Sequence, residues 1–144
     1  MSKRQSWVFL AFAVTFFCGC ATGPKYSAVA SSFANLPSGQ GHVFVYRASA
    51  MGAAVQPEIR MEGQLIGKAV PLGFFYVDRA LGNHEIVTST EVERKLTFML
   101  ESGQVRYVRL GISIGFFVGH IYPELVDTDV ALSELEDCSY IGQP

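Results

Sequence analysis

The 144-residue sequence has 49% hydrophobic residues, 17% charged residues and a formal net charge of −2. Its length suits one ordinary domain, and its apolar content is too high for a disordered chain, so a packed core is expected. The near-neutral balance, with basic residues scattered singly, excludes the electrostatic footprint of a protein that binds nucleic acid.

The N-terminal residues have the pattern of a secretory signal. Lys3 and Arg4 precede an apolar stretch at residues 7–17, which is the order of the charged and apolar regions of a signal peptide. As a helix this stretch spans only about 16 Å, half of a typical hydrocarbon core. It is too short to remain as a membrane-spanning anchor, and we expect a signal helix that is removed with residues 1–19.

The end of this signal resembles the lipobox of bacterial lipoproteins. Phe17, Cys18 and Gly19 precede Cys20, where the lipobox has an apolar residue, a small residue and Gly or Ala before its cysteine. The resemblance implies diacylglycerol on the Cys20 sulfur, cleavage before Cys20 and acylation (for example palmitate) of the new amino group. Two or three acyl chains hold a protein stably to a bilayer, so the implied partner is a membrane of the cell envelope.

The residues after the acceptor cysteine bear on the location of the domain. Ala21, where some lipoproteins carry Asp, implies by the same resemblance transfer to the outer membrane, with the domain facing the periplasm. Residues 22–41 are rich in Gly, Ala, Ser and Pro, which is typical of a linker. We interpret residues 20–41 as the lipidated cysteine and a flexible tether, in which a helix over residues 28–36 is marginal on its own.

Residues 42–138 have the pattern of an all-β domain. Residues 43–46 are apolar on both faces, which favours a strand buried on both sides. Further strands are expected over residues 58–62, 64–69, 73–78, 85–88, 95–100 and 105–114. About seven short strands with regular turn signals predict an antiparallel β-sandwich, immunoglobulin-like, prealbumin-like or PEGA-like, and an open barrel gives nearly the same pattern.

The C-terminal region departs from the strand pattern. Ala131, Leu132 and Leu135 share one face of a short helix ahead of Cys138. Residues 139–144 are expected to form a tail. Since Cys18 leaves with the signal and Cys20 is acylated, Cys138 is expected to be an unpaired thiol.

The order of motifs resembles the DUF2846 family of bacterial lipoproteins. In chain order the motifs are VFVYR (43–47), EG with IG behind it (62–67), GFFYVD (73–78), LGNH (81–84), GQVRYVR (103–109), GFFVG (115–119) and ELVD (124–127). The resemblance spans residues 42–138 and implies a lipoprotein domain, without indicating an activity. Residues 61–87 also have the spacing of PEGA-type domains, which bears only on the fold.

Short patterns that suggest catalysis do not extend to a complete site. Residues 111–115 match G-x-S-x-G, but Ser113 lies within a strand pattern, and His120 precedes every downstream Asp, which is not the hydrolase order. Residues 63–68 are one residue short of a phosphate loop and are more simply a hairpin arm. The histidines stand singly, without other metal ligands at coordinating spacing: His42, His84 and His120. We expect no catalytic residue, cofactor or metal, and a small hydrolase or metal-dependent enzyme is an alternative.

Gly111, Gly115 and Gly119 recur at a spacing of four within an apolar run at residues 110–121. Membrane helices use this spacing for close approach, so a glycine-rich membrane-active protein is a second alternative. The run is short for a spanning helix and rich in β-branched residues, which favours a strand with glycines at bends or bulges.

Phe116 and Phe117 are consecutive, so an extended backbone points them to opposite sides. The side chain that faces away from the core is a candidate partner surface, because exposed aromatic residues anchor interfaces. The sequence thus predicts a lipid-anchored, non-enzymatic β-module that binds or scaffolds an envelope protein or the cell wall.

Overall fold

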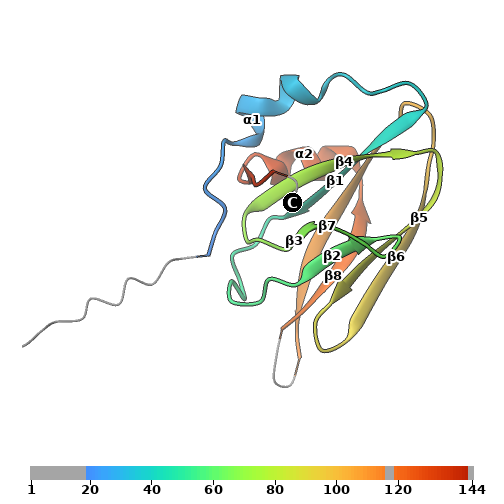
Figure 1. Ribbon diagram of the computed structural model, residues 1–144. Helices are drawn as coiled ribbons and strands as arrows, with labels where there is room; N and C mark the ends of the chain where they lie inside the picture. Colours follow the sequence, from blue (N-terminus) through green and yellow to red (C-terminus); the bar gives the residue numbers. More distant parts are fainter. Residues whose placement is uncertain (1–18, 116–118, 143–144) are drawn as a thin grey trace, which may run out of the picture.

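The computed structural model describes residues 19–115 and 119–142 (Figure 1). Within them, one sheet has five strands in the order β8-β7-β1-β4-β9, and the other has four in the order β3-β2-β5-β6. The five-stranded sheet contains β1 (Gln40–Arg47), β4 (Gly73–Ala80), β7 (Val105–Ile114), β8 (Gly119–Val126) and β9 (Ser139–Tyr140). The four-stranded sheet contains β2 (Glu58–Met61), β3 (Gln64–Lys68), β5 (Gly82–Ser89) and β6 (Glu93–Leu100). The helical elements are α1 (Tyr26–Val29), the 3-10 turn η1 (Ala30–Phe33) and α2 (Thr128–Leu135).

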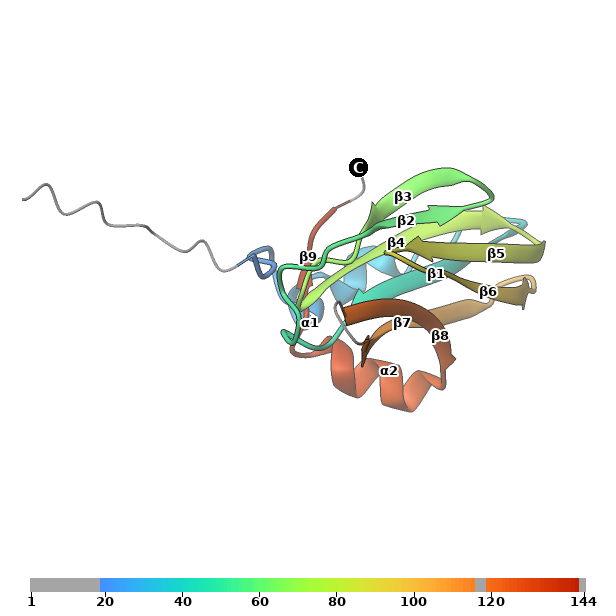
Figure 2. The same ribbon diagram turned by 90° about the horizontal axis from the view of Figure 1, so that it is seen from below.

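The predicted all-β sandwich is confirmed, with its main core between the two sheets. Val43 and Val45 of β1 face the four-stranded sheet, while Phe44 and Tyr46 face the opposite side. That outer side is covered by helical elements, and Figure 2 shows α2 on the side of β7 and β8 away from β2 and β3. β1 is therefore buried on both faces, as its continuous apolar run predicts.

Two features of the sheets differ from the prediction. The sandwich has nine strands in the described residues instead of about seven, and the five-stranded sheet is mixed, because β1 pairs in parallel with β7 and β4 pairs in parallel with β9. β8 lies at the edge of its sheet, where Pro123 is tolerated because one side of the strand needs no ladder hydrogen bond. β9 is only two residues long and exists through its pairing with β4.

The glycines of residues 110–121 that lie in strands do not form bends. β7 and β8 pair in unbroken antiparallel register from Tyr107 opposite Val126 to Ile114 opposite Gly119. A Cβ atom on Gly111 would lie 2.4 Å from the ring of Tyr122, so this glycine makes room for a cross-strand aromatic side chain. The interpretation of the run as a membrane helix is wrong for the described residues, which form paired strands.

The interpretation of residues 20–41 as a flexible tether is also corrected. The Tyr26 amide donates to the Cys138 carbonyl (3.3 Å), and the Tyr140 amide donates to the Pro24 carbonyl (2.8 Å). Phe33 is only 9% exposed and its ring contacts those of aromatic residues on β1, β4 and β9: Phe44, Phe74, Tyr76 and Tyr140. The N-terminal segment is therefore part of the second core, on the outer face of the five-stranded sheet.

The C-terminal end joins the same packing. Ala131 and Leu135 of α2 are fully buried in the second core, which confirms the predicted apolar face of this helix. Beyond it, the Ile141 amide donates to the Phe74 carbonyl (3.0 Å). Residues 139–141 thus continue the sandwich instead of leaving it as a tail.

Candidate functional site

Cys20, the residue that the lipobox resemblance designates, lies directly on the sandwich. The Gly19 carbonyl accepts a hydrogen bond from Gln56 Nε2 (2.9 Å), and the Ala21 amide donates to the Pro71 carbonyl (3.0 Å). Cys20 itself is half-buried. Figure 1 shows the start of the described chain, in blue, beside the residues that follow β1. Hydrogen bonds on both sides of Cys20 therefore fix its backbone to the domain.

A buried arginine holds the loop that contains Gln56, the residue that donates to the Gly19 carbonyl. Arg47, the last residue of β1, is 0% exposed. Its Nη1 donates to the carbonyls of Val55 (2.7 Å) and Ala69 (2.8 Å), and its Nη2 donates to those of Met51 and Gly52 (3.0 Å to Gly52). The Arg47 guanidinium thus binds both ends of the turn at residues 51–55 and also binds Ala69, the residue that follows β3.

The charge of Arg47 is compensated by backbone dipoles. Burial lowers the pKa of Arg47 from its usual value. An arginine stays protonated in proteins, so the four carbonyl oxygens stabilise a buried cation, while Nε has no hydrogen-bond partner in the described residues. We call residues 19–21, Arg47, residues 51–56 and Pro71 the attachment region.

A separate polar cluster fixes α2 to the five-stranded sheet. Tyr46 Oη donates to Glu134 Oε2 (2.5 Å), and Arg109 donates through Nη1 to Glu134 Oε1 (2.5 Å) and through Nε to Glu124 Oε1 (2.8 Å). Burial, together with Glu134, raises the pKa of Tyr46 far above its usual value, so the phenol remains a donor. The cluster joins β1, β7, β8 and α2, and its role is structural.

Cys138 is an inert thiol. Its side chain is fully buried, and Sγ donates to the carbonyls of Glu134 (3.5 Å) and Arg47 (3.8 Å). Burial raises the pKa of Cys138 to about 12. Because the thiolate is the reactive form, a raised pKa and lack of access both protect this cysteine in the folded protein.

In a variant in which Cys18 and Cys20 are serine, Cys138 is the remaining thiol, and it is expected to resist iodoacetamide at pH 8. Its alkylation should accelerate as the pH rises towards the pKa and become complete in denaturant. A version that also carries Ser102→Cys, at an exposed turn, should take up one label at once. Equal labelling rates at residues 102 and 138 in the folded protein would contradict the burial of Cys138.

The structure places the three histidines apart. The Nδ1 atom of buried His42 contacts Asp78, while its Nε2 has no partner among the described residues. The ring nitrogens of His84 contact Glu62 (3.0 Å) and the Ala80 carbonyl (2.8 Å). The third, His120, contacts Thr90. No group of three or more His, Cys, Asp or Glu residues in the described ranges is arranged to hold a metal ion.

The other sequence candidates occupy strands or fall outside the description. Ser113 lies within β7, opposite His120 of β8. Residues 64–68 are the second arm of the predicted β2–β3 hairpin, which is confirmed. Phe116 and Phe117, the candidate partner surface, lie outside the described residues. No helix in residues 19–115 or 119–142 is long and apolar enough to cross a membrane.

Neither the role of Arg47 nor the Tyr46 cluster is evident from the sequence alone. One signal was present for Arg47: a charged residue directly follows an apolar run that is buried on both faces. The cluster around Glu134 draws on four elements that are distant in the sequence, and no local pattern indicates it.

Comparison with known proteins finds uncharacterised relatives. A family described as "Protein of unknown function (DUF2846)" matches residues 37–121. A protein of Haemophilus influenzae, described as "Uncharacterized protein", is 31% identical over 105 residues, which cover 69% of this chain and 62% of that protein. The chain therefore spans less than two thirds of the length of this relative.

Proposed function

This chain belongs to the DUF2846 family, and we propose that it is a lipid-anchored β-domain of the bacterial cell envelope that binds or scaffolds another envelope component. The observation that carries the proposal is the position of Cys20. Cys20 ends the lipobox-like stretch, and the residues on both sides of it are hydrogen-bonded to the folded domain.

The geometry around Cys20 suits a processed N-terminus. After cleavage, Cys20 would begin the mature chain, and the Ala21 amide would still donate to the Pro71 carbonyl. The loss of Gly19 would remove one hydrogen bond from Gln56, whose Nε2 also donates to the Ala53 carbonyl (2.9 Å). Processing therefore leaves the fold intact and places the acyl chains at the surface of the attachment region.

The role of the domain is proposed to be non-enzymatic. Its buried and half-buried charged groups have structural partners: buried Arg47 holds the loop at residues 51–55, and half-buried Arg109 with Glu134 holds α2. The partner is then an envelope protein or the cell wall, reached from a domain on the periplasmic face of the outer membrane.

Separation of inner and outer membranes on a density gradient tests this location. The wild-type protein and Ala21→Ser are expected in the outer-membrane fraction, and Ala21→Asp, which adds a sorting charge after the acylated residue, in the inner-membrane fraction. In-cell crosslinking of the same strains should join the outer-membrane forms to one envelope component. A wild-type protein recovered in the soluble fraction, or without a crosslinked product, would contradict the proposal.

A further inference from the structure

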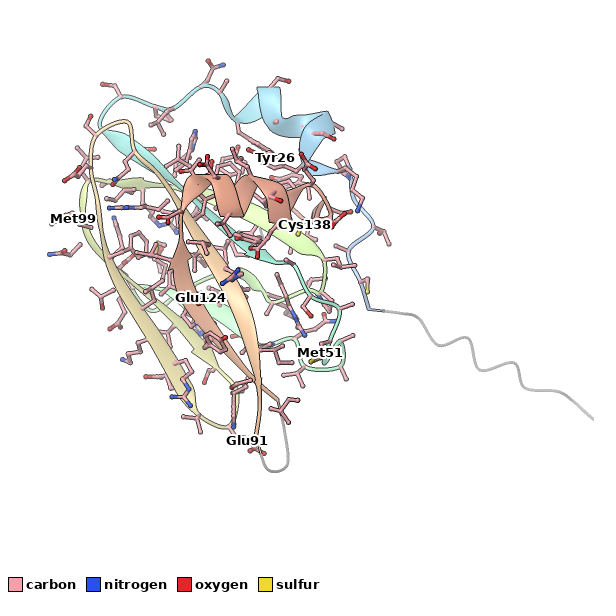
Figure 3. All side chains as sticks on the ribbon, turned by 180° about the vertical axis from the view of Figure 1, so that it is seen from behind. Tyr26, Met51, Glu91, Met99, Glu124 and Cys138 are labelled. Carbon is pink, nitrogen blue, oxygen red and sulfur yellow. The ribbon has the colours of Figure 1, made fainter. Side chains whose placement is uncertain are left out.

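Three exposed apolar side chains lie in loops or at a strand end on one end of the sandwich. Met51 is 59% exposed in the loop between β1 and β2, Val92 is 45% exposed in the turn between β5 and β6, and Ile114 is 86% exposed at the end of β7. Figure 3 shows Met51 and Glu91, the neighbour of Val92, in the lower part of the molecule, away from Tyr26 and Met99.

Contacts show that these turns are neighbours. A Cβ atom on Gly52 would lie 2.4 Å from Ile112 Cδ1, so the loop after β1 rests against the end of β7. Thr90 Oγ1 lies 3.3 Å from His120 Nδ1, and His120 pairs with Ser113, so the β5–β6 turn adjoins the β7–β8 pair. We call the surface formed by Met51, Val92 and Ile114 the apolar end.

The attachment region is continuous with the apolar end. Arg47 holds the carbonyls of Met51 and Gly52, and Gln56 of the same loop holds Gly19. No flexible linker separates Cys20 from the domain, because the amide of the next residue, Ala21, donates to the Pro71 carbonyl. Acyl chains on Cys20 would therefore bring this part of the surface to the bilayer.

We propose that the apolar end rests on the bilayer that holds Cys20, with Met51, Val92 and Ile114 at the boundary between headgroups and acyl chains. This inference rests on the proposed lipid anchor and adds a fixed orientation of the domain. Transfer of apolar side chains out of water lowers the free energy. Because the acyl chains already supply the attachment, three such side chains are sufficient to determine which side of the domain faces the lipid.

Charge favours neutral lipid as the occupant. Exposed Glu91 and Glu93 stand on either side of Val92 and are followed by exposed Arg94 and Lys95. Lys95 pairs with Glu93 (3.1 Å), so the charges of residues 91–95 cancel and give no net attraction to an anionic surface. A bilayer of zwitterionic phospholipid is therefore the surface that the apolar end fits.

Two exposed apolar residues at the opposite end provide matched controls. β5 and β6 pair from Gly82 opposite Leu100 at one end to Ser89 opposite Glu93 at the other. Leu81 (43% exposed) and Met99 (46% exposed) lie at the first end, and Val92 lies at the second. In the proposed orientation Val92 lies near the bilayer, whereas Leu81 and Met99, which have similar exposure, lie far from it.

The test uses the full lipidated protein in phosphatidylcholine vesicles with brominated acyl chains. Cysteine is introduced singly, as Met51→Cys, Val92→Cys or Ile114→Cys, with Leu81→Cys and Met99→Cys as controls, and is labelled with a fluorophore. Acylated Cys20 and buried Cys138 do not react. Bromine should quench the first three labels at least about twofold, as expected for side chains at an interfacial depth, and leave the controls unchanged.

The outcomes separate this inference from the proposed function. If the purified protein carries lipid and all five labels are quenched equally or not at all, the apolar end does not contact the bilayer, while the lipid anchor stands. If the mass of the purified protein shows no lipid, both proposals fail. Addition of anionic phosphatidylglycerol should leave quenching at residue 92 unchanged, and an increase there would contradict the preference for neutral lipid.

Discussion

Replacing Cys20 with alanine is expected to move the protein from the membrane fraction to the soluble periplasmic fraction. No helix in the described residues is long and apolar enough to cross a membrane, and acyl chains contribute about 0.8 kcal/mol for each buried CH₂ group. Loss of two or three chains thus removes the attachment. Because Cys20 is only half-buried, the change should alter the free energy of unfolding by less than about 0.5 kcal/mol.

Metabolic labelling with palmitate and cell fractionation check this result. Cys18→Ala is the matched control, since it removes a neighbouring thiol and keeps the acceptor, and it should remain labelled and membrane-bound. Circular dichroism of the soluble Cys20→Ala protein should show the β-sandwich intact. Label that persists in the Cys20→Ala protein would assign the lipid to another cysteine and contradict the assignment of Cys20.

Replacing Arg47 with methionine is expected to cost about 3–5 kcal/mol of unfolding free energy. Methionine has a similar length but donates no hydrogen bond, so the partly buried carbonyls of residues 51, 52 and 55 and the buried carbonyl of residue 69 lose their donor. The outcome is informative, because replacing buried ionic groups with apolar residues is sometimes neutral.

Urea denaturation of the soluble Cys20→Ala protein measures this cost. Arg60→Met is the control: Arg60 lies in β2 and pairs with Glu58 at the surface, and exposed ion pairs contribute at most about 1 kcal/mol. Arg47→Lys should fall between the wild type and Arg47→Met, because an ammonium group reaches fewer carbonyls. An Arg47→Met protein as stable as the wild type would show that the guanidinium does not hold the loop.

Most strands could be predicted because their burial patterns are local. β7 covers the predicted residues 105–114, and Val108 and Leu110 face the core as their alternation requires. The two elements that the sequence did not reveal depend on their neighbours. β8 contains Pro123, which argues against a central strand and is accommodated at an edge, and β9 is too short to have a pattern.

The N-terminal segment shows the limit of composition as a guide. Residues 22–41 are small and polar enough to be a linker, yet Tyr26 and Phe33 bring this segment onto the aromatic outer face of the sheet. That face becomes visible only when Phe44 of β1 and Tyr76 of β4 are placed opposite each other. A local pattern cannot show a surface that two distant strands create.

In the candidate site, too, some residues can be predicted from the sequence and others cannot. Cys20 follows from a contiguous motif, so the sequence alone designates it. Arg47 donates to backbone carbonyls, and the side chains of those residues have no part in the contact. Because every residue has a backbone carbonyl, the sequence does not indicate which residues Arg47 binds. The same holds for Gln56, which contacts Gly19 through the Gly19 carbonyl.

The mass of the N-terminal tryptic peptide of the purified protein tests the attachment at Cys20 most directly. Trypsin cleaves after Lys25, so we expect a peptide of residues 20–25, CATGPK, carrying diacylglycerol on the sulfur and an acyl group on the amino terminus. A peptide of residues 5–25, which continues through Gly19 after cleavage at Arg4, or an unmodified Cys20, would contradict it.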